Sequence, residues 1–438
     1  MLDIQFIRDN QEFLREVALA KGLSLDMDKL LALDEERRTL QQEVEELQSL
    51  KNDINTLIKE AKTDGERTEI ITKGKEIKEK LDAREPLYLA CKSQFDSLMV
   101  TVPNIVSPDT PVGKSDEENV EIMNSGSVPE FTFTPRNHIE LGELLDILDL
   151  EQGAKVSGYR GYYLKNEGVL LAMGIVSYAL AKLIQNGYTP MLPPTLVKGR
   201  ALFGTGYFKG AEYDPSVDEI YQVATDDGEE ATTKESKFLV GTAEPSLLAY
   251  YADKTLAEEE LPIRVAGISQ CYRSEIGSYG KDTKGLYRVH EFQKVEQVVI
   301  TRANLEEANA LQDEMIRLSE EMHAELGLPY RKLQICTGDM SAGKYRAFDL
   351  EAWMPGLARY GETGSASNFL DWQSRRLHVK YRETATGERK HVYMLNNTAL
   401  PVPRILIAIL ENYQQEDGSV VIPEILRPYI GKEVIAVK

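Results

Sequence analysis

The first hundred residues have a hydrophobic pattern that differs from the rest of the chain. Apolar residues recur every seven positions, at Leu33, Leu40, Leu47 and Ile54, and the faces between them are filled by Glu, Gln, Lys and Arg. A heptad repeat of apolar residues is typical of a helix that packs along a partner helix. The pattern therefore predicts a long helix with one apolar stripe.

A second stripe returns after a turn. Asp64-Gly65 supplies the turn residues. Apolar residues then recur at Ile70, Ile77, Leu81, Tyr88, Phe95 and Leu98. Two such stripes predict an antiparallel helical hairpin, a coiled-coil arm over about residues 31–100 that reaches roughly 45 Å at 1.5 Å per residue. Pro86 lies in the second stripe, so we expect a kink or break of the helix there.

A dimerising coiled coil or a scaffold is the commoner explanation for stripes of this kind. It does not explain why a short hairpin precedes a large region of different pattern. Basic residues on the arm could meet RNA phosphates, although acids are interleaved with them and a solvated helix face explains each equally well. These residues are Lys51, Lys59, Arg67, Lys73, Lys75 and Lys78.

A proline-containing, acidic stretch at about 101–129 predicts a linker. It divides the chain into an N-terminal helical domain, residues 1–110, and a second domain, residues 111–438. In the second domain the periodicity predicts helices at 169–186 and 303–326. Extended segments are predicted at 188–197, 238–240, 263–272 and 295–300. Strands separated by hairpin-like loops indicate an α+β fold with an antiparallel sheet flanked by helices.

Composition narrows the function classes. Hydrophobic residues make up 42% of the 438 residues, which excludes a disordered chain. The N-terminus does not resemble a signal peptide, and we see no stretch of about 20 apolar residues, so we expect a cytoplasmic protein without a membrane segment. The three cysteines are far apart, and no zinc site is expected. A net charge of −20 argues against a general nucleic-acid binder but leaves room for one specific RNA.

The first chemical cluster runs from Cys271 to Glu296. A strand ends in Arg273-Ser274-Glu275, a glycine-rich loop follows with Lys281 and Lys284, and a second strand returns. A guanidinium can clamp phosphate oxygens through two hydrogen bonds. Glu275 can accept from an adenine amino group, Phe292 can stack on the base, and the Val289 backbone can contact it. A lone Arg-x-Glu is usually part of an ordinary charged hairpin. The hypothesis of a nucleotide site therefore depends on further residues elsewhere in the chain.

Two further clusters supply such partners. Glu362-Thr363-Gly364-Ser365 combines a carboxylate with hydroxyls, which suits Mg²⁺ carrying substrate phosphates. Asn396 to Tyr413 reads as a polar strand end that becomes an apolar helix, with Arg404 near its start. The familiar phosphate-binding loops are missing, and Gly204-Thr205-Gly206 is interpreted as a plain turn.

Together these clusters resemble the three motifs of class II aminoacyl-tRNA synthetases. Residues 169–197 resemble motif 1, the Arg273 region motif 2, and the Asn396 to Tyr413 region motif 3. Thr242-Ala243-Glu244 resembles the serine loop of the seryl-tRNA synthetase family, and the preceding hairpin is that family's most distinctive addition. The resemblance is to the bacterial or organellar type and covers nearly the whole chain.

The resemblance implies a role for each matching position. Arg273 and Arg404 would be catalytic. Serine would be bound by Thr242, Ala243, Glu244, Arg273, Glu296 and Thr398. ATP would be bound by Arg273, Ser274, Glu275, Val289, Phe292, Glu362, Thr363, Gly364, Ser365 and Arg404. Glu362 and Ser365 would hold Mg²⁺ with the ATP phosphates.

Four positions depart from the commoner family pattern. Gly361 stands where the family often has Arg, Ala366 replaces a Cys, and Asn397-Thr398 replaces Gly-Ser. Thr398 keeps a hydroxyl, so recognition of serine remains chemically feasible. The cysteine ligand of the zinc-dependent archaeal subtype is not visible.

The resemblance implies ATP-dependent ligation of L-serine to tRNA(Ser) through a seryl-adenylate, with release of AMP and pyrophosphate, by a homodimer. Charging of tRNA(Sec) with serine is a further implication. Two alternatives remain open: a paralogue that delivers an activated amino acid to a carrier protein, and a catalytically dead homologue that serves as an RNA-binding or scaffold protein. The intact hairpin disfavours the first, and the retained arginines and glutamates disfavour the second.

Overall fold

The computed structural model describes residues 1–224, 235–276 and 284–437. The chain forms two compact units. One comprises Leu2–Leu19 and Leu23–Pro103, and the other comprises Met1, Ala20–Gly22 and Asn104–Lys438. The first is helical, and the second is built around a large sheet.

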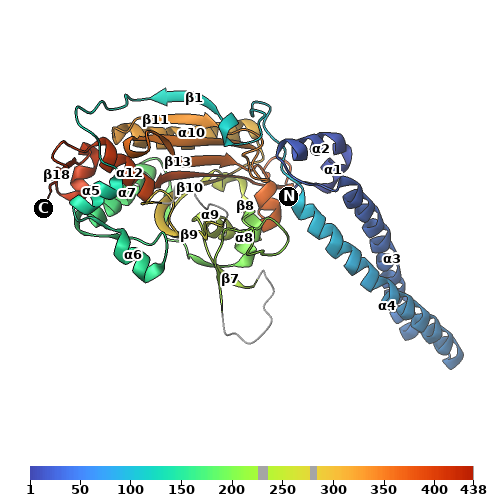
Figure 1. Ribbon diagram of the computed structural model, residues 1–438. Coiled ribbons are helices and arrows are strands. Elements are labelled where there is room, and N and C mark those ends of the chain that lie inside the picture. The colour runs from blue at the N-terminus through green and yellow to red at the C-terminus, as the bar shows by residue number, and fades with distance from the viewer. Residues whose placement is uncertain (225–234, 277–283, 438) are drawn as a thin grey trace. The chain divides into compact units, whose positions relative to one another are not determined.

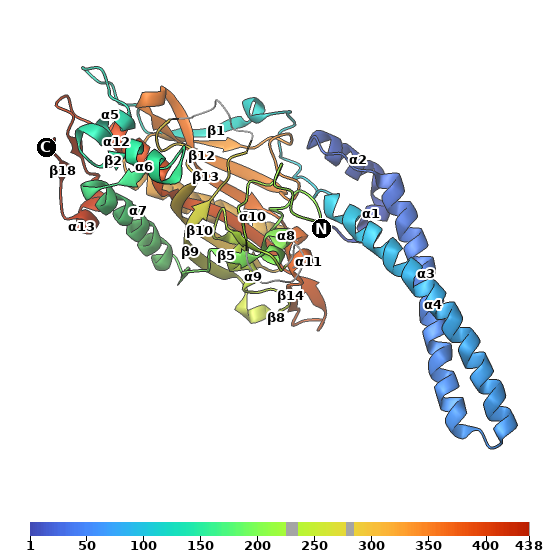
Figure 2. The same ribbon diagram turned by 60° about the horizontal axis from the view of Figure 1, so that its bottom comes forward.

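The helical unit has two short helices, α1 (Ile4–Asp9) and α2 (Gln11–Ala20), followed by two long ones, α3 (Met27–Glu60) and α4 (Asp64–Thr101). The long helices run antiparallel and side by side (Figures 1 and 2). The predicted hairpin is therefore confirmed. Its turn lies at residues 61–63, three residues earlier than predicted, because Thr63 and Glu66 form a capping box that draws Asp64 and Gly65 into α4.

The two stripes meet along a seam that is tightest near the base of the hairpin. Leu33, Leu40 and Val44 of α3 are buried, whereas Leu50 and Leu57 nearer the tip are about half exposed. The break predicted at Pro86 is wrong, since α4 continues through it. A proline inside a helix costs about 3 kcal/mol. Seam packing on both sides of the exposed Pro86, by the buried Leu81 and Cys91, offsets that cost.

The second unit contains an eight-stranded sheet with the order β1-β11-β12-β13-β16-β10-β9-β4. Its strands are β1 (Val120–Ser125), β4 (Thr189–Met191), β9 (Ile263–Tyr272), β10 (Glu291–Thr301), β11 (Tyr330–Gln334), β12 (Arg346–Met354), β13 (Arg359–Asn368) and β16 (Tyr393–Pro401). Every neighbouring pair is antiparallel except β4 with β9. The predicted antiparallel sheet is confirmed.

The helices α7 (Asn166–Gln185), α10 (Leu305–Glu325) and α12 (Val402–Asn412) cover one face of the sheet. Side chains alternate along a strand, so the odd-numbered residues of β10 face these helices. Val295 and Val299 belong to the shared apolar core, and Gln297 donates to the Met315 carbonyl of α10. The even-numbered residues, among them Lys294 and Glu296, face the opposite side.

Smaller elements complete the unit. The remaining helices are α5 (His138–Leu144), α6 (Leu150–Ser157), α8 (Gly199–Thr205), α9 (Glu244–Ala249), α11 (Trp372–Leu377) and α13 (Arg427–Ile430). The remaining strands are β2 (Leu148–Asp149), β3 (Tyr163–Leu164), β5 (Leu196–Lys198), β6 (Gln222–Val223), β7 (Lys237–Leu239), β8 (Thr255–Ala257), β14 (Lys380–Arg382), β15 (Arg389–His391), β17 (Val420–Val421) and β18 (Val434–Ile435). α9 and α11 lie with β8 and β14 around a second apolar cluster that includes Val298 of β10.

Three local predictions need correction. The stretch predicted as a linker contains β1, which pairs with β11 at the sheet edge. The extended segment 188–197 is divided between β4 and β5, which belong to different sheets because the prolines at 193 and 194 interrupt pairing. The plain turn at Gly204–Gly206 is the end of α8, which Gly206 caps with a left-handed φ of +87°.

Helix α7 also differs from expectation. It is long and apolar enough to cross a membrane, although the sequence showed no obvious span. Half of its apolar window is buried inside the unit, against the sheet. Its length and composition are therefore those of a core helix, with Val169, Leu170, Met173 and Ile184 left partly exposed.

Candidate active site

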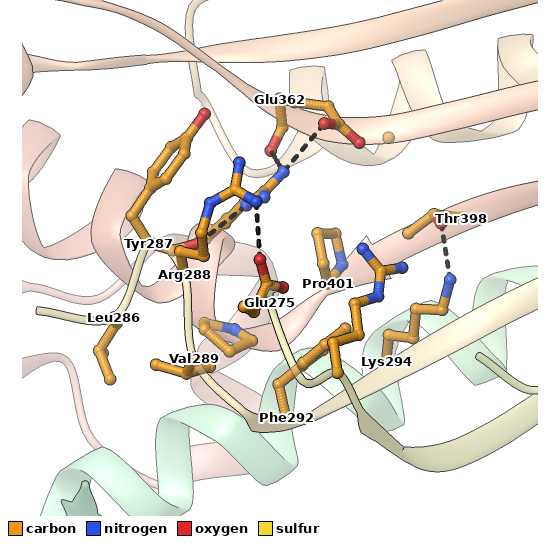
Figure 3. A pocket seen from close by; sticks show the side chains of 14 residues that line it. Glu275, Leu286, Tyr287, Arg288, Val289, Phe292, Lys294, Glu362, Thr398 and Pro401 are labelled. Atoms are coloured by element: carbon orange, nitrogen blue, oxygen red, sulfur yellow. Dashed lines mark hydrogen bonds and ion pairs between the residues drawn. The ribbon is translucent and has the colours of Figure 1, made fainter. Parts of the chain in front are cut away.

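A pocket opens where the β9–β10 connection meets β13, β16 and the start of α12 (Figure 3). Eight predicted site residues line it: Arg273, Glu275, Val289, Phe292, Glu362, Gly364, Thr398 and Arg404. Six others that the sequence did not single out also line it: Leu286, Tyr287, Arg288, Lys294, Pro401 and Pro403. Segments up to about 130 residues apart in the chain thus converge on one cavity.

One end of the pocket holds a hydroxyl between an acid and a base. The pairing of β10 with β16 shifts by one residue, so that Val295 pairs with Leu400 but Glu296 pairs with Thr398. This bulge at Ala399 turns Thr398 toward the face of Lys294 and Glu296. Lys294 Nζ donates to Thr398 Oγ1 at 3.1 Å and lies 2.5 Å from Glu296 Oε2. Thr398 Oγ1 donates to Glu296 Oε2 at 3.4 Å.

The predicted serine loop lies next to this end. Gly267 on β9 pairs with Glu296. A Cβ on Gly267 would stand only 2.7 Å from Leu247 and 3.0 Å from Ala243 Cβ, so its absence lets α9 approach the sheet. The start of α9 carries Glu244, which is therefore close enough to Glu296 to interact with it electrostatically.

Glu244 is buried and held from two sides. Tyr207 donates its hydroxyl to one carboxylate oxygen at 2.8 Å, and Gln373 donates its amide to the other at 2.7 Å. Burial, followed by the nearby Glu296 charge, raises the pKa of Glu244 to about 7. No sequence pattern marks Tyr207 or Gln373 as site residues, because each contacts Glu244 only through the fold.

Arg273 is fixed through its backbone. Its N–H donates to the His290 carbonyl at 2.9 Å, and His290 Nδ1 lies 2.8 Å from the Arg273 carbonyl. The guanidinium stands over the Phe292 ring at 5.3 Å and donates from Nε to the Gly241 carbonyl at 3.4 Å. It therefore spans from Gly241, next to the predicted serine loop, to Phe292 in the pocket.

Glu275 has an unusual backbone, with φ at +52°. Only a few per cent of non-glycine residues adopt this region, and they cluster at functional sites. Arg288 holds the Glu275 carboxylate at 2.7 Å, and Arg160 lies 3.8 Å from it. Arg288 and Arg160 were missed by the sequence prediction, since arginines in loops are common.

Arg404 organises the opposite wall. Its Nη1 donates to the Glu362 carbonyl at 2.9 Å and lies 3.2 Å from the Glu362 carboxylate. Its Nε donates to the Tyr287 carbonyl at 3.1 Å, and the guanidinium stacks 4.5 Å above the Tyr287 ring. Withdrawal from water would raise the pKa of Glu362, but Arg404 and then Arg273 lower it more, so that it lies below its ordinary value.

A second bulge brings Glu362 and Ser365 to one face. Residues three apart in a regular strand point to opposite faces. Here Ser365 pairs with Asp349 and Glu362 pairs with Glu351, so Thr363 is the extra residue of the bulge. Asp349, missed by the sequence prediction, lies beside Ser365, and burial followed by Glu362 raises its pKa to about 7.

These oxygen donors fit Mg²⁺. Within the described ranges Asp349 Oδ1 is buried without a hydrogen-bond partner, close to the Ser365 hydroxyl and the Glu362 carboxylate. Hard oxygen ligands are those that Mg²⁺ prefers. In the part of the chain that the structure describes, no three His, Cys, Asp or Glu side chains group closely enough to hold a metal alone. Substrate phosphates would therefore have to complete the coordination.

The Thr363 side chain points away from the pocket. His323 of α10 lies 2.7 Å from Thr363 Oγ1 through Nε2 and 2.7 Å from the Ser319 carbonyl through Nδ1. Burial lowers the pKa of His323 to about 4, so the imidazole is neutral and accepts from the Thr363 hydroxyl. Any contact of Thr363 with ATP would use its backbone.

Gly361 stands where the family often has Arg, and crowding around this position explains the glycine. A Cβ at this position would lie 2.7 Å from the Tyr287 ring and 2.8 Å from Met354 Sδ. Tyr287 occupies that space because it stacks under Arg404. An arginine at position 361 would therefore displace the ring that supports Arg404.

Family models match the chain in two parts. The seryl-tRNA synthetase N-terminal domain matches residues 1–106, and the class II tRNA synthetase core domain (G, H, P, S and T) matches residues 221–413. A serine–tRNA ligase of Rubrobacter xylanophilus is 40% identical over 99% of both chains. A serine–tRNA ligase of Deinococcus radiodurans is 41% identical over 99% of both chains.

Solved structures agree with these matches. Seryl-tRNA synthetase from Pyrococcus horikoshii, complexed with ATP, has a TM-score of 0.87 and 35% identity and covers 100% of both chains. The cytoplasmic serine–tRNA ligase from Naegleria fowleri, in complex with AMP, has a TM-score of 0.84 and 31% identity over 100% of this chain and 99% of its own. The chain belongs to the seryl-tRNA synthetase family, the class II aminoacyl-tRNA synthetases that join serine to tRNA.

Proposed function

We propose that this chain ligates L-serine to tRNA(Ser) in two steps, through a seryl-adenylate. The observation that carries the proposal is the convergence of Arg273, Arg404 and the Lys294–Thr398–Glu296 cluster on one pocket. A nucleotide needs cations along its phosphates, and serine needs partners for its hydroxyl and ammonium groups. One cavity supplies both.

The first step needs little more than positioning and charge. The serine carboxylate is already a nucleophile, and it attacks the α-phosphorus of ATP as pyrophosphate leaves. Arg273 lies between the serine loop and the nucleotide side, so it can hold both the serine carboxylate and the α-phosphate. Arg404 binds the γ-phosphate end and balances its charge. Glu362 and Ser365, with support from Asp349, would hold a magnesium ion, which would supply additional charge neutralisation on the phosphates.

Adenine would lie in the part of the pocket lined by Phe292 and Arg288. The Glu275 carboxylate, which Arg288 fixes at 2.7 Å, accepts from the adenine amino group, and the Val289 backbone contacts the ring. The backbone atoms of Ser274 and Gly364 would contact the nucleotide from its two sides. The similarity to a family member solved with ATP supports binding of ATP by this chain.

Serine would bind at the polar end of the pocket. Thr398 lies beside its hydroxyl, and Glu296 contacts its ammonium group. Thr242 and Glu244 face both groups, with Ala243 between them in the serine loop. Alanine would leave these buried polar groups without a partner, so the site would reject it strongly. The extra methyl of Thr398, compared with a serine at this position, narrows the space available to a threonine substrate.

The arm would bind tRNA through backbone and shape. The six basic arm residues, Lys51, Lys59, Arg67, Lys73, Lys75 and Lys78, all lie on α3 or α4 within the outer half of the hairpin. Of these, Lys73 pairs with Glu69 while 63% of its side chain remains exposed. Lys281 lies outside the described residues, and Lys284 is exposed beside the pocket loop. Use of tRNA(Sec) as a second acceptor belongs to the same proposal.

A homodimer and a cytoplasmic location complete the proposal. The partly exposed apolar residues of α7, the motif 1 helix, are suited to a contact with a second copy. ATP and Mg²⁺ are the proposed cofactors, and zinc is not expected, so ligation should survive removal of zinc.

Two assays test the function. Serine-dependent exchange of pyrophosphate into ATP should be observed with Mg²⁺, and purified tRNA(Ser) should then be charged with serine. Exchange without charging, combined with transfer of serine to a carrier protein, would favour the carrier ligase. Failure of both exchange and ATP binding would favour the dead homologue.

A further inference from the structure

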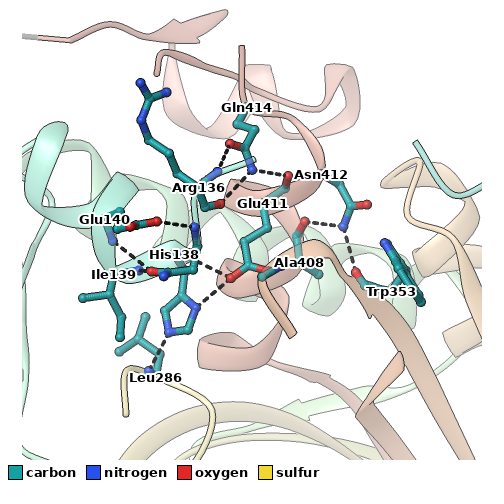
Figure 4. A network of polar contacts seen from close by, with 12 residues as sticks. Arg136, His138, Ile139, Glu140, Leu286, Trp353, Ala408, Glu411, Asn412 and Gln414 are labelled. Carbon is teal, nitrogen blue, oxygen red and sulfur yellow. Dashed lines mark hydrogen bonds and ion pairs between the residues drawn. The ribbon is translucent and has the colours of Figure 1, made fainter. Parts of the chain in front are cut away.

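A buried histidine lies behind the nucleotide pocket, outside every cluster that the sequence singled out. His138 is the first residue of α5, and only 4% of its surface is exposed. Its ring lies between α12 and the end of the β9–β10 connection (Figure 4). No substrate group named above touches it, so its burial and bonding need another explanation.

The hydrogen bonds of His138 assign its tautomer. The Leu286 backbone N–H donates to Nε2 at 3.1 Å. A backbone N–H can only donate, so Nε2 carries no proton and the ring proton is on Nδ1. Nδ1 lies 2.8 Å from Glu411 Oε1 and donates to it. The imidazole therefore joins the loop backbone to a carboxylate in one fixed orientation.

Glu411 is fully buried, and its carboxylate accepts three hydrogen bonds. Besides Nδ1, it accepts from the His138 backbone N–H at 2.8 Å and from the Gly356 N–H at 2.8 Å. It lies on α12, seven residues and about two helical turns after Arg404. The same helix thus holds the phosphate-end arginine and anchors His138.

The contact with Leu286 acts on two pocket walls. The next residue, Tyr287, stacks under Arg404 and accepts from its Nε at 3.1 Å. The residue after that, Arg288, fixes the Glu275 carboxylate at 2.7 Å. A shift of Leu286 would therefore misplace the supports of both the adenine side and the γ-phosphate side.

Gly285 shows how close the packing is. Its φ is +75°, and a Cβ there would lie 2.0 Å from His138 Nε2. Glycine is required both by this conformation and by the approach of the ring. The loop end is thus shaped to receive the imidazole.

We propose that His138 is a positioning residue for ATP, which braces the loop end at Leu286 against Glu411 of the Arg404 helix. The proposal rests on the proposed function, because it assigns the two supported walls to the two ends of the nucleotide. It predicts that the brace affects ATP and leaves serine alone, since within residues 1–224, 235–276 and 284–437 no hydrogen bond or ion pair joins the brace to the Lys294–Thr398–Glu296 end.

Two substitutions at one position separate the two halves of the brace. In His138→Asn, the amide can still donate to Glu411 from near the Nδ1 position but offers Leu286 no acceptor. In His138→Gln, the amide oxygen can reach the Nε2 position and accept from Leu286. Asn137→Ala is the control for α5, because Asn137 only caps the helix through the Ile139 and Glu140 amides.

The dissociation constant of ATP is measured by calorimetry with Mg·ATP, and KM values for ATP and serine are measured by pyrophosphate exchange on the full chain. His138→Asn should raise both ATP constants about tenfold, the effect of one unsatisfied buried donor, with the serine KM changed less than about twofold. His138→Gln should recover most of the ATP affinity. Asn137→Ala should lower the melting temperature without changing either KM.

Equal ATP constants in wild type and His138→Asn would overturn the brace. So would equal losses for ATP and serine, or a failure of His138→Gln to differ from His138→Asn while both remain folded by circular dichroism. If wild type binds ATP but shows no serine-dependent exchange, the proposed function fails, and calorimetry still tests the brace.

Discussion

The helical arm and the catalytic unit use polar residues in opposite ways. In α3, six of 34 residues are buried, whereas in β10 eight of 11 are buried, including Lys294 and Glu296. Apart from the buried Asp34, which pairs with Arg8 and Arg37, α3 keeps its charges in water, where each ion pair contributes about 0–1 kcal/mol. The second unit, which contains the pocket, buries charged side chains and pairs them with one another. Removing one partner leaves the other buried without its counter-charge, which costs several kcal/mol. The comparison predicts that substitutions in the pocket alter chemistry, whereas changes in the arm alter only RNA delivery.

The largest expected effect is the loss of pyrophosphate exchange when a charged residue of the pocket is removed. Arg273→Ala removes the cation proposed to hold both the serine carboxylate and the α-phosphate. Serine-dependent pyrophosphate exchange should fall about 1,000-fold, as when a charge-stabilising donor is lost. Arg317→Ala, at an exposed residue of α10, is the control and should leave exchange unchanged. Retained exchange in the Arg273 variant would remove that residue from the mechanism.

The next effect tests the arm. Deleting residues 48–79 and joining the two helices by a short glycine-containing turn removes the outer half of the hairpin while keeping the buried base at Leu40 and Val44. Charging of tRNA(Ser) should fall about 100-fold, because RNA contacts worth a few kcal/mol are lost. Exchange should stay within about twofold, since the pocket lies wholly in the other unit. Loss of exchange would contradict the separation of the two regions.

A smaller effect concerns recognition of serine. Thr398→Val keeps the shape of the side chain and removes the hydroxyl that joins Lys294 to Glu296. The KM for serine should rise about 10- to 100-fold, with the KM for ATP nearly unchanged, because only the amino-acid end loses a hydrogen bond. Thr398→Ser is the matched variant and should behave like wild type in exchange kinetics. Equal serine KM values for the valine and serine variants would dismiss Thr398 as a contact.

The smallest effect is a pH dependence. The pKa of Glu244 is raised from an ordinary 4.5 to about 7, so at pH 6 the folded protein holds a proton there that the unfolded chain has lost. This carboxyl therefore lowers the free energy of unfolding progressively as pH rises from about 4.5 to about 7. A serine ammonium prefers the ionised carboxylate, so the KM for serine should fall as pH rises from 6 to 8, by up to about tenfold.

Glu244→Gln provides the comparison for that pH dependence. The amide keeps the size of the side chain but cannot ionise, so its serine KM should be higher and nearly constant between pH 6 and 8. Exchange kinetics at fixed ionic strength measure both profiles. A wild-type profile as flat as that of the glutamine variant would show that Glu244 does not titrate when serine binds.

Much of the fold can be predicted from the local pattern of apolar and polar residues. The heptads predicted the hairpin because each helix needs only one apolar stripe, and the stripe is visible in sequence. Strand β9 was predicted at residues 263–272, its bounds in the structure, because apolar residues predominate in it and a polar, glycine-rich stretch follows. The break predicted at Pro86 is wrong because local sequence shows only the energetic cost of a proline in a helix. The packing along the seam that offsets this cost depends on the partner helix. Strand β1 was missed because its exposed, polar residues are stabilised by pairing with β11.

The sequence by itself determined which residue types are available for the chemistry, namely Arg273 and Arg404 and the acids Glu244, Glu275, Glu296 and Glu362. Its strand alternation also determined that Lys294 and Glu296 face the same side. Only the tertiary structure decided which of them meet. The bulges at Thr363 and Ala399 depend on pairing with a neighbouring strand, and they alone turn Ser365 toward Glu362 and Thr398 toward Glu296. The partners of Glu244 and the His138 brace likewise come from elements 37 to 273 residues away, a separation that no local pattern can encode.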